Sequence, residues 1–198
     1  MRGDAADKYL TFRSALDRAM AAVLLVILAP ALGIISLLIL LDSPGSVIFK
    51  QKRVGIHKSY FEIYKFRTMR ADAPGDVPTH LMEDEDAYLT RVGRVLRRFS
   101  LDELPQLANI LKGDMAFVGP RPALWNQDDL VTERDRYGAN DVLPGLTGWA
   151  QINGRDELTI ARKARLDGYY ANHLGPVMDL ACIAGTVVAV VTGRGMKK

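Results

Sequence analysis

Two adjacent acids, Asp102 and Glu103, are the residues whose types and surroundings suggest chemistry, because they directly follow a segment rich in arginine. An ionised aspartate is a competent nucleophile toward phosphorus, as in aspartyl-phosphate intermediates. Attack on a diphosphate also requires positive charge around its oxygens, usually from Mg²⁺ held by carboxylates, and arginines attract phosphate too. The residues therefore permit phosphoryl transfer, with the acids preceded by Arg91, Arg94, Arg97 and Arg98.

Two helices are expected to position the acids. Before them, apolar residues recur with the i, i+3, i+4, i+7 spacing of an amphipathic helix, at Val92, Val95, Leu96 and Phe99. A merely solvated helix face is the alternative explanation for the arginines on the opposite side. After the acids, a second apolar stripe predicts a helix that ends at Gly113; it consists of Leu104, Leu107, Ala108 and Leu111.

The acid pair also has a purely structural explanation. Ser100 and Glu103 match the S-x-x-E spacing of a capping box, and Asp102 can itself be an N-cap, with Pro105 tolerated in the first turn. A helix start also suits chemistry, because it holds a carboxylate ionised and binds anions. Taken in isolation, the pair is better explained by capping than by catalysis.

A strand with two cations is expected upstream of the acids. Tyr60 to Met69 is rich in aromatic residues and reads as a β-strand. On a strand, Lys65 and Arg67 would point to the same face. They can grip a diphosphate there, and the charged edge of a sheet explains them equally well.

One hydrophobic segment, Ala21 to Leu41, contains 21 residues without a charge. About 20 apolar helical residues span a bilayer, so a transmembrane helix is the first interpretation. Pro30 lies in the middle of the segment, and lysines and arginines flank it on both sides, so the positive-inside rule gives no orientation. A helix that bends at Pro30 and leaves by the face it entered explains both features. An ordinary spanning helix that contains a proline remains the alternative.

Composition restricts the other possibilities. The 198 residues suit one compact unit, and a net charge of +3 with a pI near 9.0 is too weakly basic to argue for nucleic acid. The single cysteine, Cys182, cannot form an internal disulfide. Near the C-terminus, the apolar stretch Pro176 to Thr192 is 17 residues long and carries an acid, which favours an interfacial or core-packed helix.

Four sequence blocks follow the hydrophobic segment in a fixed order. They are IYKFRTM (Ile63 to Met69), SLDELPQL (Ser100 to Leu107), NILKGDMAFVGPRP (Asn109 to Pro122) and LPGLTGWAQINGR (Leu143 to Arg155). Together they resemble the small monotopic phosphoglycosyl transferases of bacterial glycan assembly, over most of the chain.

The resemblance implies a ping-pong reaction. Asp102 would attack the β-phosphorus of a UDP-sugar, UMP would leave, and a phosphosugar-aspartyl intermediate would form. Polyprenyl (undecaprenyl) phosphate would then take the phosphosugar. Asp102 and Glu103 would hold Mg²⁺, and Glu103 would also help to deprotonate or orient the acceptor.

The resemblance also assigns basic residues to the substrates. Lys65, Arg97 and Arg121 match basic positions of the family's motifs and are expected to grip the diphosphate or the acceptor phosphate. A turn-stabilising role between two prolines is the alternative for Arg121. The expected substrate-binding set is completed by Arg67 on the strand and by two residues near the uridine or the sugar, Gln151 and Arg155.

In this family the hydrophobic helix breaks at a proline, so that both of its ends stay in the cytoplasm. The expected bend is therefore at Ala29 and Pro30, although the family usually has a serine where this chain has Ala29. A serine hydroxyl can bond a carbonyl that the bend frees. The resemblance places the protein on inner-membrane lipids of a bacterium, with its catalytic domain on the cytoplasmic face.

The expected fold class is a helix-rich α/β (α+β) soluble body with an N-terminal re-entrant membrane helix hairpin and interfacial helices. The expected division is a membrane segment at 1–45 and a catalytic domain at 46–198. The partners are a UDP-sugar, polyprenyl phosphate and membrane lipids, with no nucleic acid. A non-catalytic membrane-anchored scaffold and a lipid-diphosphate phosphatase are the alternatives.

Overall fold

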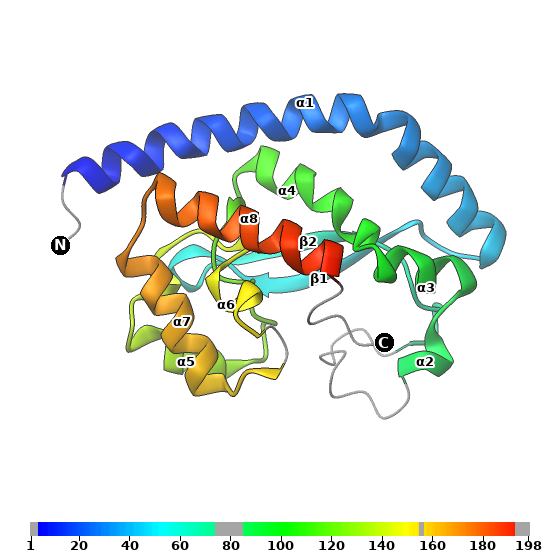
Figure 1. The fold of residues 1–198 in the computed structure, drawn as a ribbon. Coiled ribbons are helices and arrows are strands. Elements are labelled where there is room, and N and C mark those ends of the chain that lie inside the picture. Colours follow the sequence, from blue (N-terminus) through cyan, green and yellow to red (C-terminus); the bar gives the residue numbers. More distant parts are fainter. Residues whose placement is uncertain (1–3, 74–84, 155–156, 193–198) are drawn as a thin grey trace.

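A single long helix, α1 (Asp4–Asp42), arches over the rest of the protein in the computed structural model, which describes residues 4–73, 85–154 and 157–192 (Figure 1). Pro30 lies inside α1 and does not end it. A proline removes one helical hydrogen bond and tends to kink the helix, and α1 turns through a wide bend in its second half (Figure 1). The expected re-entrant hairpin with a bend at Ala29 and Pro30 is not confirmed, because α1 is continuous through Pro30.

Both ends of α1 are attached to the same body. Near its start, Arg13 Nη1 donates a hydrogen bond to the Tyr170 hydroxyl at 2.8 Å. Near its end, Ile39 is buried in the core, and the Asp42 carboxylate accepts a hydrogen bond from the Val92 backbone N–H at 2.8 Å. The helix is therefore fixed to the body at both ends.

Between its two ends, α1 presents an uncovered apolar face. The part from Lys8 to Asp42 is long and apolar enough to cross a membrane, by length and composition. Its exposed large apolar side chains include Val23, Val26, Ile27, Ile34, Leu37, Leu38, Leu40 and Leu41. An exposed apolar surface of this extent is typical of a membrane or protein contact.

Two small sheets form the centre of the described structure. Strands β1 (Ile48–Val54) and β2 (Tyr60–Phe66) make an antiparallel hairpin through the short turn η1 (Ile56–Lys58), with Gln51 opposite Ile63 and Arg53 opposite Phe61. Because side chains alternate along strands, Gln51 and Arg53 share a face with Ile63 and Lys65. Strands β3 (Ala116–Val118) and β4 (Gly145–Thr147) pair in parallel.

Helices and short turns make up most of the remaining body (Figure 1). The hairpin is followed along the chain by α2 (Glu85–Tyr88), α3 (Arg91–Arg98), the 3-10 segment η3 (Leu101–Gln106) and α4 (Leu107–Lys112). The C-terminal part contains α5 (Asp128–Asp135), η4 (Ala139–Asp141), α6 (Trp149–Ile152), α7 (Ile160–Asn172) and α8 (Pro176–Thr192). The expectation of a helix-rich mixed α and β body is confirmed.

Helix α8 packs on the core along one face and is uncovered on another. Cys182 is fully buried in a core cluster with Val118 and Tyr170. On the uncovered face, Val177 and Leu180 are 81% and 64% exposed. The expected packing of this helix on the core is confirmed, and its interfacial role stays a prediction.

Candidate active site

Asp102 and Glu103 lie in η3, between the arginine-bearing helix α3 and helix α4. Helix α3 begins at Thr90, whose hydroxyl accepts a hydrogen bond from the Gly93 N–H at 2.9 Å. Ser100 adopts a left-handed conformation with φ 55°, and its side chain makes no capping hydrogen bond. The capping-box explanation for Ser100 and Glu103 is therefore wrong.

Asp102 is not the cap of the following helix either. The residue that precedes α4 is Gln106, and Gly113 ends the helix as expected, with φ 89°. With neither acid used in a cap, their burial needs another explanation. Only 9% of Asp102 is exposed, and the Glu103 side chain is 15% exposed.

Glu103 forms two ion pairs that join distant parts of the chain. Its Oε1 atom accepts hydrogen bonds from Lys65 Nζ at 2.9 Å and from Arg121 Nη2 at 2.8 Å. Burial by itself would raise the pKa of Glu103, but Arg121 and Lys65 outweigh it and hold this pKa well below the usual range. Glu103 is therefore ionised across the physiological pH range.

Asp102 responds differently to the same surroundings. Burial and the adjacent negative charge of Glu103 raise its pKa, while Lys65, Arg97 and Arg121 act in the opposite direction without cancelling the increase. Two neighbouring acids thus have pKa values shifted in opposite directions. Such a separation is common at catalytic sites.

Arg97 approaches this cluster from α3. Its Nε donates a hydrogen bond to Thr68 Oγ1 at 3.0 Å, and its positive charge acts on Asp102. The segment after β2 is held against α3 very closely, since a Cβ atom on Gly93 would lie 2.0 Å from the Thr68 carbonyl oxygen. This contact fixes α3, and with it Arg97, relative to the strand that carries Lys65.

Arg121 reaches Glu103 from a tightly held segment that follows β3. The Gly119 N–H bonds the Thr147 carbonyl at 2.8 Å, and the Gly145 N–H bonds the Pro120 carbonyl at 2.9 Å. The sequence blocks that contain GPRP and PGLTG are therefore one backbone-packed unit. This unit positions Arg121 beside Glu103.

A buried ion pair supports the same segment from the other side. Arg134 on α5 donates to the Arg121 carbonyl at 3.0 Å and pairs with Asp167 on α7 at 2.6 Å. Both side chains of the pair are at most 5% exposed. Position 121 is thus held through its backbone, independently of the bond from its guanidinium to Glu103.

Comparison with known proteins identifies the family. The sequence model of the bacterial sugar transferase family matches residues 8–193. The chain belongs to the bacterial sugar transferase family. The predicted resemblance to phosphoglycosyl transferases is thereby confirmed, and so is the expectation of an enzyme of this class.

Individual relatives of the transferase agree with this assignment. It is 43% identical over 152 residues to the uncharacterized sugar transferase EpsL of Bacillus subtilis, covering 77% of this chain and 73% of that protein. It is 40% identical over 199 residues to the exopolysaccharide production protein PSS of Rhizobium leguminosarum, covering 94% and 98%. A UDP-glucose:undecaprenyl-phosphate glucose-1-phosphate transferase of Caulobacter vibrioides is 45% identical over 141 residues, covering 70% of this chain and 52% of that protein. The match therefore spans only about half of the Caulobacter relative.

The structure brings together four of the residues proposed for substrate binding and catalysis: Asp102, Glu103, Lys65 and Arg121, with Arg97 beside Asp102. Arg67 has other contacts, since it donates to the carbonyls of Ser43 at 2.6 Å and Pro44 at 2.8 Å. It holds the turn after α1. Gln151 donates to the Leu146 carbonyl at 2.9 Å and lies on α6, and Arg155 falls outside the described residues.

Sequence reasoning missed one residue of the transferase cluster, Arg53 on β1. Its Nη1 donates to the Pro122 carbonyl at 3.0 Å, and its Nη2 donates to Gln51 Oε1. Burial and the nearby charge of Arg121 lower the pKa of Arg53 to about 9, so it remains charged at neutral pH. The sequence does indicate that Gln51 and Arg53, two residues apart on one strand, point to the same face. It does not give the strand register that places this face beside Lys65.

The acids also fit the needs of a magnesium ion. Within the described ranges, no group of three or more His, Cys, Asp or Glu side chains gathers. Mg²⁺ often takes only one or two carboxylates from the protein and further oxygens from substrate phosphates. Both ion pairs of Glu103 use Oε1, so its Oε2 atom lies outside these two pairs.

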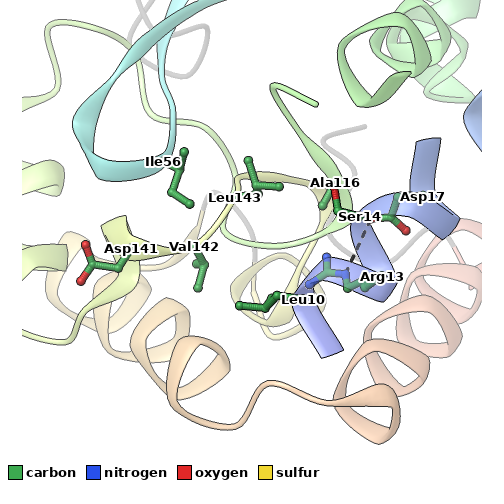
Figure 2. Close-up of a pocket in the computed structure, with 9 residues that line it drawn as sticks. All are labelled: Leu10, Arg13, Ser14, Asp17, Ile56, Ala116, Asp141, Val142 and Leu143. Carbon is green, nitrogen blue, oxygen red and sulfur yellow. Dashed lines mark ion pairs between the residues drawn. The ribbon is translucent and has the colours of Figure 1, made fainter. Parts of the chain in front are cut away.

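A separate cavity of about 90 Å³ lies below the first turns of α1 (Figure 2). Leu10, Arg13, Ser14 and Asp17 line it from α1, and Ile56, Ala116, Asp141, Val142 and Leu143 line it from the body. None of these residues belongs to the acid cluster. The cavity is therefore distinct from the candidate active site of the transferase.

Proposed function

We propose that the protein transfers a sugar-1-phosphate from a UDP-sugar to undecaprenyl phosphate, with Asp102 as the nucleophile. The observation that carries the proposal is the partly buried cluster in which Lys65 and Arg121 both bind Glu103 next to Asp102. Relatives named as undecaprenyl-phosphate sugar-phosphate transferases support the choice of donor and acceptor.

The reaction has two displacement steps. A carboxylate oxygen of Asp102 forms a bond to the β-phosphorus of the donor, and the bond from that phosphorus to the bridging oxygen breaks, so that UMP leaves with the electron pair. A phosphate oxygen of undecaprenyl phosphate then attacks the phosphosugar-aspartyl intermediate. The bond to Asp102 breaks, and its carboxylate is regenerated.

The surrounding cations favour the first step. Phosphoryl transfer depends mainly on positioning and on neutralising charge on the phosphate oxygens. Lys65 and Arg121 are fixed by Glu103, and Arg97 lies beside Asp102. A diphosphate seated against these cations would present its β-phosphorus to Asp102.

Glu103 is proposed to orient these cations and not to act as a base. A general base works best when its pKa lies near the working pH. The pKa of Glu103 is held far below that range by Arg121 and Lys65, despite its burial. A carboxylate that is fully ionised and already accepts two charged hydrogen bonds is a weak proton acceptor.

We further propose that Asp102 and Glu103 hold Mg²⁺ in the working enzyme. When bound, the ion would neutralise charge on the diphosphate oxygens. The protein's own contribution is to keep Asp102 buried and close to its cations, so that little reorganisation is needed as the charge moves.

The proposed location is the cytoplasmic face of the bacterial inner membrane, with α1 as a re-entrant element. A helix of 39 residues is about 58 Å long at about 1.5 Å per residue. Hydrocarbon about 30 Å thick would separate the ends of a straight spanning helix. Here Arg13 and Asp42, near opposite ends of α1, both bind the same body, which supports an arrangement with both ends on one side.

The reaction is tested by intact mass spectrometry of the purified protein with Mg²⁺ and a panel of UDP-sugars, in the absence of lipid. One phosphosugar adduct on Asp102, absent from Asp102→Asn and retained in the exposed control Asp72→Asn, is the expected result. UMP release only in the presence of lipid, without an adduct, contradicts the covalent step. Release of inorganic phosphate without a nucleotide-sugar would indicate a phosphatase, and no turnover with any donor would indicate a scaffold.

A further inference from the structure

Arg53 is a partly buried cation that forms no ion pair with the described residues. Its hydrogen-bond acceptors, the Pro122 carbonyl and Gln51 Oε1, are both neutral. Its Nε atom is buried and has no hydrogen-bond partner in the described part of the chain. A buried charge without a counter-charge is costly, so an arginine at this position needs a reason beyond packing.

The charges around Arg53 suggest why a cation is present at this position. Arg53 lies close enough to Arg121 and Glu103 for their charges to act on it: Arg121 lowers its pKa and Glu103 raises it. The cations of the cluster, Arg53, Lys65, Arg97 and Arg121, carry four positive charges, whereas Asp102 and Glu103 carry at most two negative charges. An anion that enters this cluster would relieve the excess positive charge.

A purely architectural role does not explain Arg53 well. Its strand is already joined to the Arg121 segment by the backbone, since the Val54 N–H bonds the Ala123 carbonyl at 2.9 Å. A neutral donor could bond the Pro122 carbonyl without burying a charge. The contacts that Arg53 makes within the fold therefore do not explain why this residue is positively charged.

We propose that Arg53 is a further anion-recognition residue of the active site: its partly buried charge attracts the donor's diphosphate, and its bond to Pro122 holds the adjacent Arg121. This inference rests on the proposed function for the identity of the anion. The inference predicts that removing the charge weakens anion binding without destabilising the anion-free protein. The reason is that a charge that favours the bound anion is unfavourable while the site is empty.

Pyrophosphate is a suitable probe because it carries the diphosphate charge without uridine or sugar. Its affinity is measured by calorimetry on the full chain in detergent, at a fixed Mg²⁺ concentration, together with the melting temperature of the anion-free protein. Arg53→Gln removes the charge and keeps an N–H donor. Arg53→Lys keeps the charge and loses the guanidinium fork. The control is Arg136→Gln, an exposed arginine of α5's C-terminal end.

We expect Arg53→Gln to weaken pyrophosphate binding at least tenfold while the melting temperature of the anion-free protein stays unchanged or rises. Arg53→Lys should retain most of the affinity, and Arg136→Gln should match the wild type. Unchanged affinity in Arg53→Gln overturns the inference, as does an equal loss of melting temperature in both Arg53 variants, which would indicate architecture alone. Neither result affects the adduct on Asp102, so failure here is distinguishable from failure of the proposed function.

Discussion

Glu103 and Arg121 are 18 residues apart in sequence, and their side chains meet at 2.8 Å in a partly buried ion pair. The pair joins η3 to the segment after β3, and Lys65 adds the β-hairpin through the same carboxylate oxygen. One acid thus joins side chains from three of the four sequence blocks. Removing its charge should affect all of them at once.

Replacing Glu103 by Gln should lower the rate of adduct formation about a hundredfold, a typical loss for one electrostatic contact in an active site. Lys65 and Arg121 would lose their common partner, and the diphosphate would be held less precisely. The measurement is single-turnover UMP release with a UDP-sugar. A rate within twofold of the wild type would contradict the orienting role of Glu103.

The same substitution should shift the pH dependence of the reaction. Asp102 reacts as the carboxylate, so activity falls as the pH falls through its pKa. Burial and then Glu103 raise that pKa, and the wild-type acid limb should therefore lie above the ordinary aspartate value of about 3.9. Glu103→Gln removes one raising influence and should move the limb to lower pH, whereas Lys65→Met should move it to higher pH. Superimposable profiles of kcat/KM would rule out this electrostatic coupling.

The sequence blocks named side chains that the structure brings together, but the sequence did not predict the local structure around them. The sequence blocks contain Lys65, Asp102, Glu103 and Arg121, so roles for these residues could be proposed from the sequence. The helix cap at Ser100 was wrong because S-x-x-E is a local pattern, and bonds from Lys65 and Arg121 to Glu103 override it. Long-range contacts of this kind are absent from a local pattern.

Two other features depended on information that the sequence does not contain. Arg53 could not be placed in the cluster without the register of β1 against β2. Pro30 predicts a local distortion, but whether the helix breaks or bends depends on the contacts at its ends, such as those of Arg13 and Asp42. The helix-rich body and helix α3 followed directly from the apolar spacing.

Loss of the buried pair between Arg134 and Asp167 should destabilise the protein strongly. Asp167→Asn leaves the Arg134 guanidinium buried without its counter-charge, which typically costs about 3–5 kcal/mol of unfolding free energy. The control is Lys50→Gln, which breaks an exposed pair with Glu62 and should have little effect. Chemical denaturation measures both. Equal stability of the two variants would show that the buried pair is not important for the fold.

Gly119 should tolerate no side chain. A Cβ atom there would lie 2.3 Å from the Leu143 carbonyl oxygen, so Gly119→Ala must displace the segment that carries Arg121. We expect loss of adduct formation and a lower melting temperature. Gly33→Ala is the matched control, since a Cβ at Gly33 meets nothing within 4 Å. Full activity of Gly119→Ala would mean that the contact between the two blocks is dispensable.

The membrane arrangement can be tested by labelling from the aqueous phase. Single cysteines at Ala5 and Ser46, in a Cys182→Ser background, flank the apolar part of α1. Because Arg13 and Asp42 bind one body, both positions should react with a membrane-impermeant maleimide from the cytoplasmic side only. A cysteine at Val26, which is 75% exposed on the apolar face, should be protected by lipid in intact membranes and become reactive in mild detergent. Labelling of the two flanks from opposite sides would establish a straight crossing, and with it a detachment of one end of α1 from the body.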